Sequence, residues 1–353
     1  MVERDVTLAN GTTERVLAPQ VYLSRLHEAD LKPSGALIAA NVIDINDSVN
    51  NSGTIRANTA LSINAKDITN RAGTISSGGS AALVAGNDIL NLSGKISGES
   101  INLTAGRDIR NERTSKEATH TVSDNPQTRS GFGFANMAQA PTTAAIKDTE
   151  LGLEAGINAT RTLSLHAERD ITIIGAAIDA GADAMVNAGR DLTVGVLTAT
   201  NTTTADRNAV YQNTVTQLTS SVKTEGNLTL VSGNDMHLTS ATLDVGTLRQ
   251  AQGDRGNLTM VAGGDLTFDA SKNSTSLRYN TGSSTGRFND ETVLGSTLNA
   301  GNNITLAATR LSSDVSEARS DGKGNITLSS ATINSSQGKV TLAADADYGG
   351  PRI

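Results

Sequence analysis

The 353-residue chain has no cysteine and no tryptophan, and only 2% of its residues are aromatic. A chain so poor in large side chains suits a narrow core of stacked small and β-branched residues. The lack of cysteine leaves the cellular compartment open, because exported bacterial rods dispense with cysteine as cytosolic proteins do. No apolar run approaches the roughly 18 residues of a transmembrane helix, so none is expected.

Signals of nucleic-acid binding and of metal or cofactor chemistry are also missing from the sequence. The net charge is −7 with both signs interspersed, and no basic stripe is available to meet the phosphates of a duplex. The four histidines form no H-x-x-x-H or H-E-x-x-H motif. No G-x-S-x-G, Walker loop or dinucleotide fingerprint occurs. We therefore expect no nucleic-acid partner, no metal, no cofactor and no small-molecule substrate.

The sequence does contain an internal repeat. The phrase "LTAGRDIRN" at 103–111 returns in eight copies, seven of them with an aspartate in the same place. These acids are Asp67, Asp88, Asp108, Asp170, Asp191, Asp235 and Asp265, and Asn303 takes the place in the eighth copy. Copies 67/88, 88/108 and 170/191 are 21, 20 and 21 residues apart, and a second mark, "GTI" or "GKI", recurs at Gly53, Gly73 and Gly94. A unit of about 20 residues with two corners is therefore interrupted by inserts.

Apolar residues alternate within each unit, as Ile101, Leu103 and Ala105 do before Asp108. Such alternation predicts strands, and the apolar residue after every acid predicts a new strand directly after the corner. Short strands, small-residue corners and the period together predict an all-β fold, a right-handed parallel β-helix with coils of about 20 residues and hairpin or loop excursions. We expect a lead-in or capping segment at 1–34, a continuous β-helix at 35–346 and a tail at 347–353, the whole being a fragment of a longer rod.

The repeated acids admit a structural and a functional interpretation. Acids stacked about 5 Å apart would repel each other by roughly 0.8 kcal/mol in water. An Asx-type turn, in which the carboxylate accepts backbone N–H groups at the corner, would offset this cost. Arg107, Arg169 and Arg190 directly precede acids and can compensate charge between coils. Calcium is the competing interpretation, but the G-G-x-G-x-D pattern of calcium β-rolls is missing, so we predict structural turns.

A second polar position follows three residues after the acid in the early coils, where Asn70, Asn91 and Asn111 stand. Stacked asparagines can form a structural amide ladder along the axis. In later coils the same position becomes apolar, which predicts a change of cross-section near the first long insert. The apolar residues assigned to it are Ile173, Val194, Leu238, Phe268 and Leu306.

Catalysis is the weaker functional class. Parallel β-helices do host polysaccharide lyases and hydrolases, which need convergent carboxylates in a groove. Here the carboxylates are spread along the axis and aromatic platforms for sugars are nearly absent from the coils. We expect a protein that is not an enzyme.

Three inserts, at about 112–155, 199–225 and 271–294, leave the repeat and return to it. They hold the candidate contacts to a partner or a membrane: Phe132, Phe134, Tyr211, Tyr279 and Phe288. Polar and apolar alternation in the second and third predicts hairpins, whereas Pro126, Pro141 and "GFGF" in the first predict a mobile loop. Excursions on a repeat scaffold are common binding sites, but these could equally extend a sheet.

The strings "VLAPQVYL" at 17–24, "GALIAANVIDI", "NSGTIRANTALSINAKDITNRAGTI", "LTAGRDIRN" and "GSTLNAGNNITLAA" carry a family resemblance. Over nearly the whole chain they resemble the haemagglutinin-repeat region of filamentous haemagglutinin-type exoproteins, the secreted partners of two-partner secretion systems. Their order is most similar to the second repeat region of contact-dependent growth inhibition effectors.

This resemblance implies a rod secreted to the surface of a Gram-negative bacterium through an outer-membrane transporter. It further implies that the region engages the outer membrane of a target cell, or a protein in it, and supports toxin delivery. An adhesin shaft that only spaces a distal binding site remains the alternative.

Overall fold

A computed structural model describes residues 2–7, 13–18, 35–124, 142–205, 210–246, 256–280, 284–309 and 324–344. The chain divides into two compact units, residues 1–30 and 31–353. The first contains one antiparallel hairpin, β1 (Val2–Thr7) with β2 (Thr13–Ala18). The rest of the predicted lead-in at 1–34, apart from this hairpin, and the predicted tail at 347–353 lie outside the described residues.

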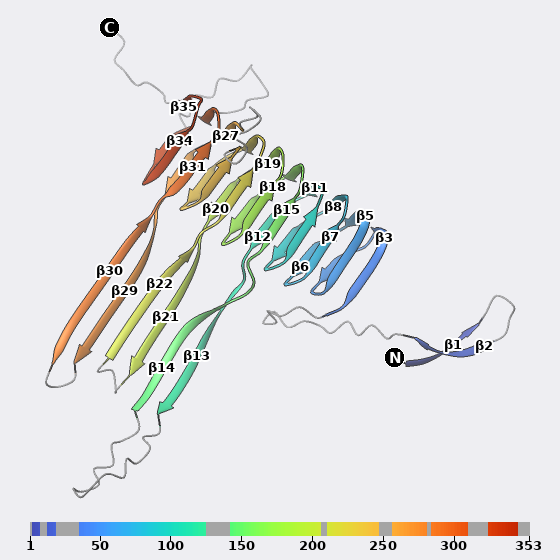
Figure 1. The fold of residues 1–353 in the computed structure, drawn as a ribbon, viewed down its shortest axis with the longest axis horizontal. Coiled ribbons are helices and arrows are strands. Elements are labelled where there is room, and N and C mark those ends of the chain that lie inside the picture. Colours follow the sequence, from blue (N-terminus) through green and yellow to red (C-terminus); the bar gives the residue numbers. More distant parts are fainter. Residues whose placement is uncertain are drawn as a thin grey trace, which may run out of the picture. The chain divides into compact units, whose positions relative to one another are not determined.

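The second unit is the predicted all-β parallel β-helix, which confirms the fold class (Figure 1). Each coil contributes one short strand to each of three faces, and each strand pairs in parallel with its equivalents in neighbouring coils. Strand partners such as Ile75 and Ile96, or Leu83 and Leu103, are 21 and 20 residues apart. The repeat period in the sequence is therefore the length of one coil.

The three faces follow one another along the chain in every coil. Strands β3 (Leu37–Ile45) and β5 (Thr54–Ala65) run through the corner between the first and second faces. The first face continues with β7 (Thr74–Ser77), β10 (Lys95–Gly98), β15 (Gly156–Ala159), β18 (Ala177–Ala180), β23 (Ser221–Thr224), β26 (Thr242–Val245), β31 (Ser296–Ala300) and β34 (Ala331–Ser335). The second continues with β8 (Ser80–Ala85), β11 (Ser100–Ala105), β16 (Leu163–Ala167), β19 (Ala184–Ala188), β24 (Leu228–Ser232), β27 (Leu258–Ala262), β32 (Ile304–Ala308) and β35 (Val340–Ala344). The third consists of β4 (Val49–Asn51), β6 (Ile68–Arg71), β9 (Ile89–Leu92), β12 (Ile109–Glu112), β17 (Ile171–Ile174), β20 (Leu192–Gly195), β25 (Met236–Thr239), β28 (Leu266–Asp269) and β33 (Ile326–Leu328).

Columns of identical or similar side chains fill the interior. Alternate residues of each strand point inward, so period-two apolar residues become buried columns that run along the axis. One column on the second face contains Leu83, Leu103, Leu165, Val186, Leu230, Met260 and Leu306, all essentially inaccessible to solvent. Each such side chain contributes about 1.5–3 kcal/mol by its burial. The core is thus narrow and continuous, and this agrees with the scarcity of large aromatic side chains in the sequence.

Three hairpins leave the rod at the corner between the third and first faces. They are β13 (Ser115–Asp124) with β14 (Thr142–Leu151), β21 (Leu197–Ala205) with β22 (Val210–Leu218), and β29 (Ser271–Asn280) with β30 (Thr285–Leu294). The first insert therefore has strands on both arms, and the stretch that was predicted to be mobile is not tested. Its Pro126, Pro141 and "GFGF" lie outside the described residues. The second excursion ends before β23, because Ser221–Thr224 already pairs on the first face of the rod.

The hairpins join into one six-stranded antiparallel sheet, in which β14 pairs with β21 and β22 with β29 (Figure 1). Hairpins follow β12, β20 and β28, whereas the coils of β17, β25 and β33 turn the same corner with one left-handed residue, Gly175, Ser240 or Ser330. Every second coil in this part of the rod thus carries a hairpin. Coils and strands repeat at the same spacing of about 4.8 Å, so two coils match the two strands of one hairpin. This match allows neighbouring hairpins to pair.

Among the described residues, no helix is long and apolar enough to cross a membrane.

Candidate functional site

The repeated acids line the corner between the second and third faces, and they link coils to one another. The Oδ1 atoms of Asp88, Asp108, Asp170, Asp191, Asp235 and Asp265 each accept the backbone N–H of the equivalent residue one coil later, at 2.8–3.3 Å. Asp67 instead accepts the side-chain amide of Asn87 at 3.4 Å. The predicted Asx turn is thus corrected in one respect: the donors belong to the following coil and not to the acid's own corner.

The arginines before the acids also act between coils. Arg107 binds Asp88, Arg169 binds Asp108 and Arg190 binds Asp170, so each cation pairs with the acid of the preceding coil. The guanidinium of Arg190 and the N–H of Asp191 both donate to Asp170, and they lower the pKa of its carboxyl group. These bonds stabilise the charged form of the acid and offset repulsion along the ladder.

This ladder predicts a specific acid sensitivity. Because the folded-state pKa of Asp170 is lowered, its contribution to stability is present above the unfolded-state pKa and is lost as pH falls through the folded-state pKa. Asp170→Asn should lower the melting temperature at neutral pH. The difference in melting temperature between this variant and the unsubstituted protein should become smaller below about pH 4. The matched control is Asp179→Asn on β18, since Asp179 forms no ion pair with any described residue. A constant difference across the pH range would contradict this role.

Eight copies of this corner were assigned from the sequence, and the eighth, at Asn303, was wrong. Ile304 pairs with Leu258, so Asn303 is equivalent to Asn257 at the corner between the first and second faces. The true successor of Asp265 is Asn325, whose backbone N–H and side-chain amide both bond to the Asp265 carboxylate. Consequently Leu306 lies on the second face, and Leu328 is the residue that stacks on Phe268.

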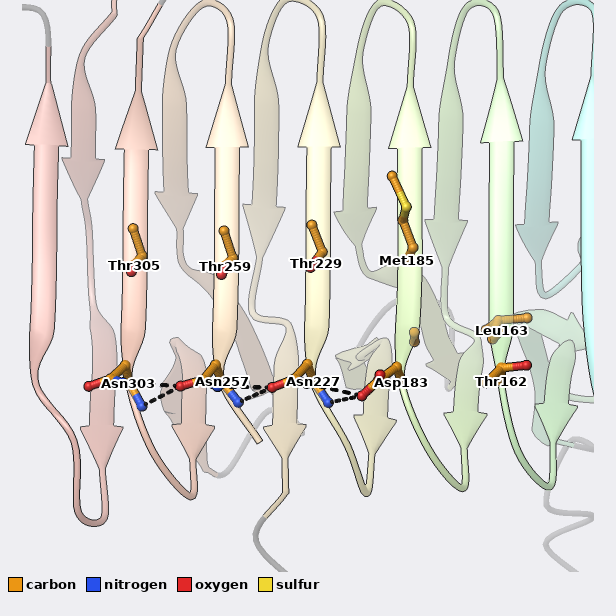
Figure 2. A pocket seen from close by; sticks show the side chains of 11 residues that line it. Thr162, Leu163, Asp183, Met185, Asn227, Thr229, Asn257, Thr259, Asn303 and Thr305 are labelled. Carbon is orange, nitrogen blue, oxygen red and sulfur yellow. Dashed lines mark hydrogen bonds between the residues drawn. The ribbon is translucent and has the colours of Figure 1, made fainter. Parts of the chain in front are cut away.

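Asn303 belongs to a second polar ladder, which the sequence analysis missed. Asp183, Asn227 and Asn257 each accept both the backbone N–H and the side-chain amide of the next member, at 2.7–3.2 Å (Figure 2). Asn303 in turn accepts the backbone N–H of Lys339. The asparagine that begins strings such as "NLTL" at 227–230 was the available signal for this ladder.

A shallow groove of about 660 Å³ runs beside this ladder (Figure 2). Thr229, Thr259 and Thr305 stack in register along it, preceded by Met185. Among the residues that line the groove, only Asp183 is ionisable, and its carboxylate is bonded within the ladder. Glycoside hydrolysis uses a pair of carboxyl groups that flank the scissile bond, and the groove lining holds one, so the groove gives no support for that chemistry.

The inward asparagines form a continuous amide ladder, and it is longer than the sequence analysis proposed. Asn51 donates to Asn70, Asn70 to Asn91, and Asn91 to Asn111, at 2.7–2.8 Å, and all four are buried. The next residue in this column is Ile173, where the polar column ends.

The "GTI" and "GKI" marks are explained by this ladder. A Cβ atom at Gly73 or Gly94 would collide with the side-chain amides of the ladder. Alanine stands in place of this glycine at Ala155, after the first hairpin, and at Ala176, after the column has become apolar at Ile173. The glycine mark is therefore part of the same structural unit as the asparagines.

The projecting sheet holds the candidate aromatic contacts that the structure describes. Tyr211 faces Arg278 across β22 and β29, Tyr279 pairs with Val210 and Gly286, and Phe288 pairs with Leu277. Phe132 and Phe134 lie outside the described residues. Tyr279 and Phe288 are 38% and 56% exposed. The structure thus brings three of the five predicted residues to neighbouring strands.

Comparisons with protein-family models, with curated proteins and with solved structures find no match. The function must therefore be argued from the site itself. Within the described residues, no group of three or more His, Asp or Glu side chains is arranged to hold a metal ion. The projecting sheet carries the described candidate aromatic contacts on strands with no buried residues, so it is the candidate functional site.

Proposed function

We propose that this chain is part of a rod of a filamentous haemagglutinin-type exoprotein, secreted to the surface of a Gram-negative bacterium through an outer-membrane transporter. In this proposal, the projecting sheet engages the outer membrane of a target cell, or a protein in it, and supports toxin delivery in contact-dependent growth inhibition. The repeated strings support the family proposal. The parallel β-solenoid fold is compatible with a rod or an adhesin shaft.

One observation carries the proposal: none of the described residues forms a layer over the projecting sheet. None of the residues of β21, β22, β29 and β30 is buried. A sheet normally buries at least one face against another element. A six-stranded sheet with no buried residue in these four strands therefore lacks a packing partner within the described part of the chain.

Apolar side chains on one face of this sheet indicate what kind of contact is missing. Cross-strand partners share a face, so the apolar residues Ile146, Leu277 and Phe288 lie in one row across the sheet, together with the polar residues His120, Thr203 and Gln212. Exposed apolar groups of this kind mark protein or membrane contacts. A shaft that only spaces a distal site needs no such row, because its corners can close with one residue as at Gly175.

The test replaces the hairpins and leaves the rod intact. Residues 115–151, 197–218 and 271–294 are each exchanged for a single glycine corner, alone and together, and circular dichroism verifies the β-helix. Sedimentation with purified outer-membrane vesicles measures binding. We expect partial loss in single variants and complete loss in the triple variant. Undiminished binding by the triple variant would support the adhesin shaft instead. In a toxin-bearing parent, the same replacements should abolish toxin entry into target cells while surface display persists.

A further inference from the structure

Two arginines lie directly opposite each other near the tip of the third hairpin. Arg278 on β29 and Arg287 on β30 are cross-strand partners, and both are exposed. Like charges placed directly opposite in an antiparallel pair destabilise it. The arginine pair therefore does not stabilise the hairpin that carries it.

The other cations of the same face are neutralised within the sheet. Lys147 binds Glu117 at 2.8 Å, and Lys272 binds Glu291 at 3.1 Å. No ion pair joins Arg278 or Arg287 to a carboxylate in the described part of the chain. The surrounding side chains on this face are uncharged hydrogen-bonding groups, among them Asn213, Ser276 and Asn289.

Tyr211 helps to fix the orientation of one guanidinium group. Its ring lies under Arg278, with the guanidinium carbon 5.6 Å from the ring centroid. Such a cation–π contact holds the cation over the ring and leaves its N–H groups available. Guanidinium groups bind phosphate through paired N–H···O bonds, which gives them a geometric advantage over lysine.

Three apolar or aromatic side chains lie near the tip on the opposite face of the same strands. Leu277, Tyr279 and Phe288 alternate with the arginines along β29 and β30, and therefore point to the other side. Apolar and aromatic side chains next to arginines suit the boundary between acyl chains and headgroups of a membrane. The apolar and aromatic side chains enter the acyl region there, and the arginines reach the phosphates. Free phosphate would account for the arginines but not for the apolar and aromatic side chains.

We propose that Arg278 and Arg287, with Tyr211, bind the phosphate of a lipid headgroup while Leu277, Tyr279 and Phe288 contact the acyl region beside it. This inference rests on the proposed membrane contact of the sheet and names the lipid chemistry that it recognises.

The test measures sedimentation of the purified chain with phosphatidylcholine vesicles that do or do not contain phosphatidylglycerol. Binding should require the anionic lipid and should weaken about 30-fold in R278Q/R287Q, as expected for two interfacial cations contributing about 1 kcal/mol each. The matched control, K147Q/K272Q, removes two cations from the same face and should bind as the unsubstituted chain does. Circular dichroism and melting temperature verify that both variants fold.

Further measurements distinguish lipid phosphate from free phosphate, and they distinguish the phosphate site from the proposed membrane contact of the sheet. Excess inorganic phosphate at constant ionic strength should leave vesicle binding unchanged, and displacement would overturn the lipid assignment. R278K/R287K should recover only part of the binding, whereas full recovery would overturn the paired guanidinium site. If R278Q/R287Q matches the control while the chain still binds outer-membrane vesicles, the phosphate site is wrong and the membrane contact stands. If the unsubstituted chain binds neither the phosphatidylglycerol-containing vesicles nor the outer-membrane vesicles, both proposals are overturned.

Discussion

Phe268→Ala is expected to lower the free energy of unfolding by about 3–5 kcal/mol. Phe268 is the largest fully buried side chain among the described residues, and it stacks between Leu238 and Leu328 on the third face. Removing the ring leaves a cavity that the neighbouring coils cannot fill, because their backbones are fixed by the parallel hydrogen bonds on all three faces.

Denaturant unfolding measures this effect, and hydrogen exchange locates it. Protection should fall first in β25, β28 and β33, since each coil of a solenoid depends on its immediate neighbours. Phe288→Ala is the control of identical chemistry, because Phe288 is 56% exposed and its removal should change stability by no more than about 0.5 kcal/mol. Equal effects of the two substitutions would contradict the placement of the core.

Asn91→Ala is expected to cost about 2–5 kcal/mol, because it interrupts the amide ladder in its middle. The side chain of Asn91 accepts from Asn70 and donates to Asn111 and to the carbonyl oxygen of Gly94. Its loss leaves buried polar groups on both sides without their partner, and water cannot replace it in a closed interior.

Asn111→Ile is the informative comparison, since Ile173 is the natural residue at this position one coil later. This substitution breaks only one side-chain to side-chain bond of the ladder, that from Asn91, and extends the apolar column by one coil. It should cost about 1–2 kcal/mol by denaturant unfolding. If Asn111→Ile were as damaging as Asn91→Ala, the ladder would not act as a chain of coupled bonds.

The fold was predictable because its information is local. Alternation within each strand and a polar corner after it recur at the coil length, so residues such as Leu103 and Asp108 specify both strand and corner. The amide ladder was predictable for the same reason. Asn51 was missed because it stands four residues after Asp47, one more than in the other copies, although "NSGTI" places it before the same glycine mark.

The remaining features depend on contacts that the local sequence does not specify. "SGNDMHL" and "AGNNITL" look alike, yet only the pairing of Leu258 with Ile304 shows that the second string turns a different corner. The pairing of β14 with β21 joins residues such as Asp148 and Asn201, whose segments have no buried face to reveal their register. These hairpins pair because they leave the rod at the same corner on every second coil.

The alternation of hairpin-bearing coils with plain coils has a consequence for how such rods can change length. Inserting or deleting a single coil between β20 and β28 would shift one hairpin by the width of one strand, which would leave either a gap or an overlap in the projecting sheet. A change of two coils together with one hairpin would preserve the pairing. Growth of this region is therefore restricted by parity: the rod can be lengthened in even steps alone if the surface it presents is to remain unbroken.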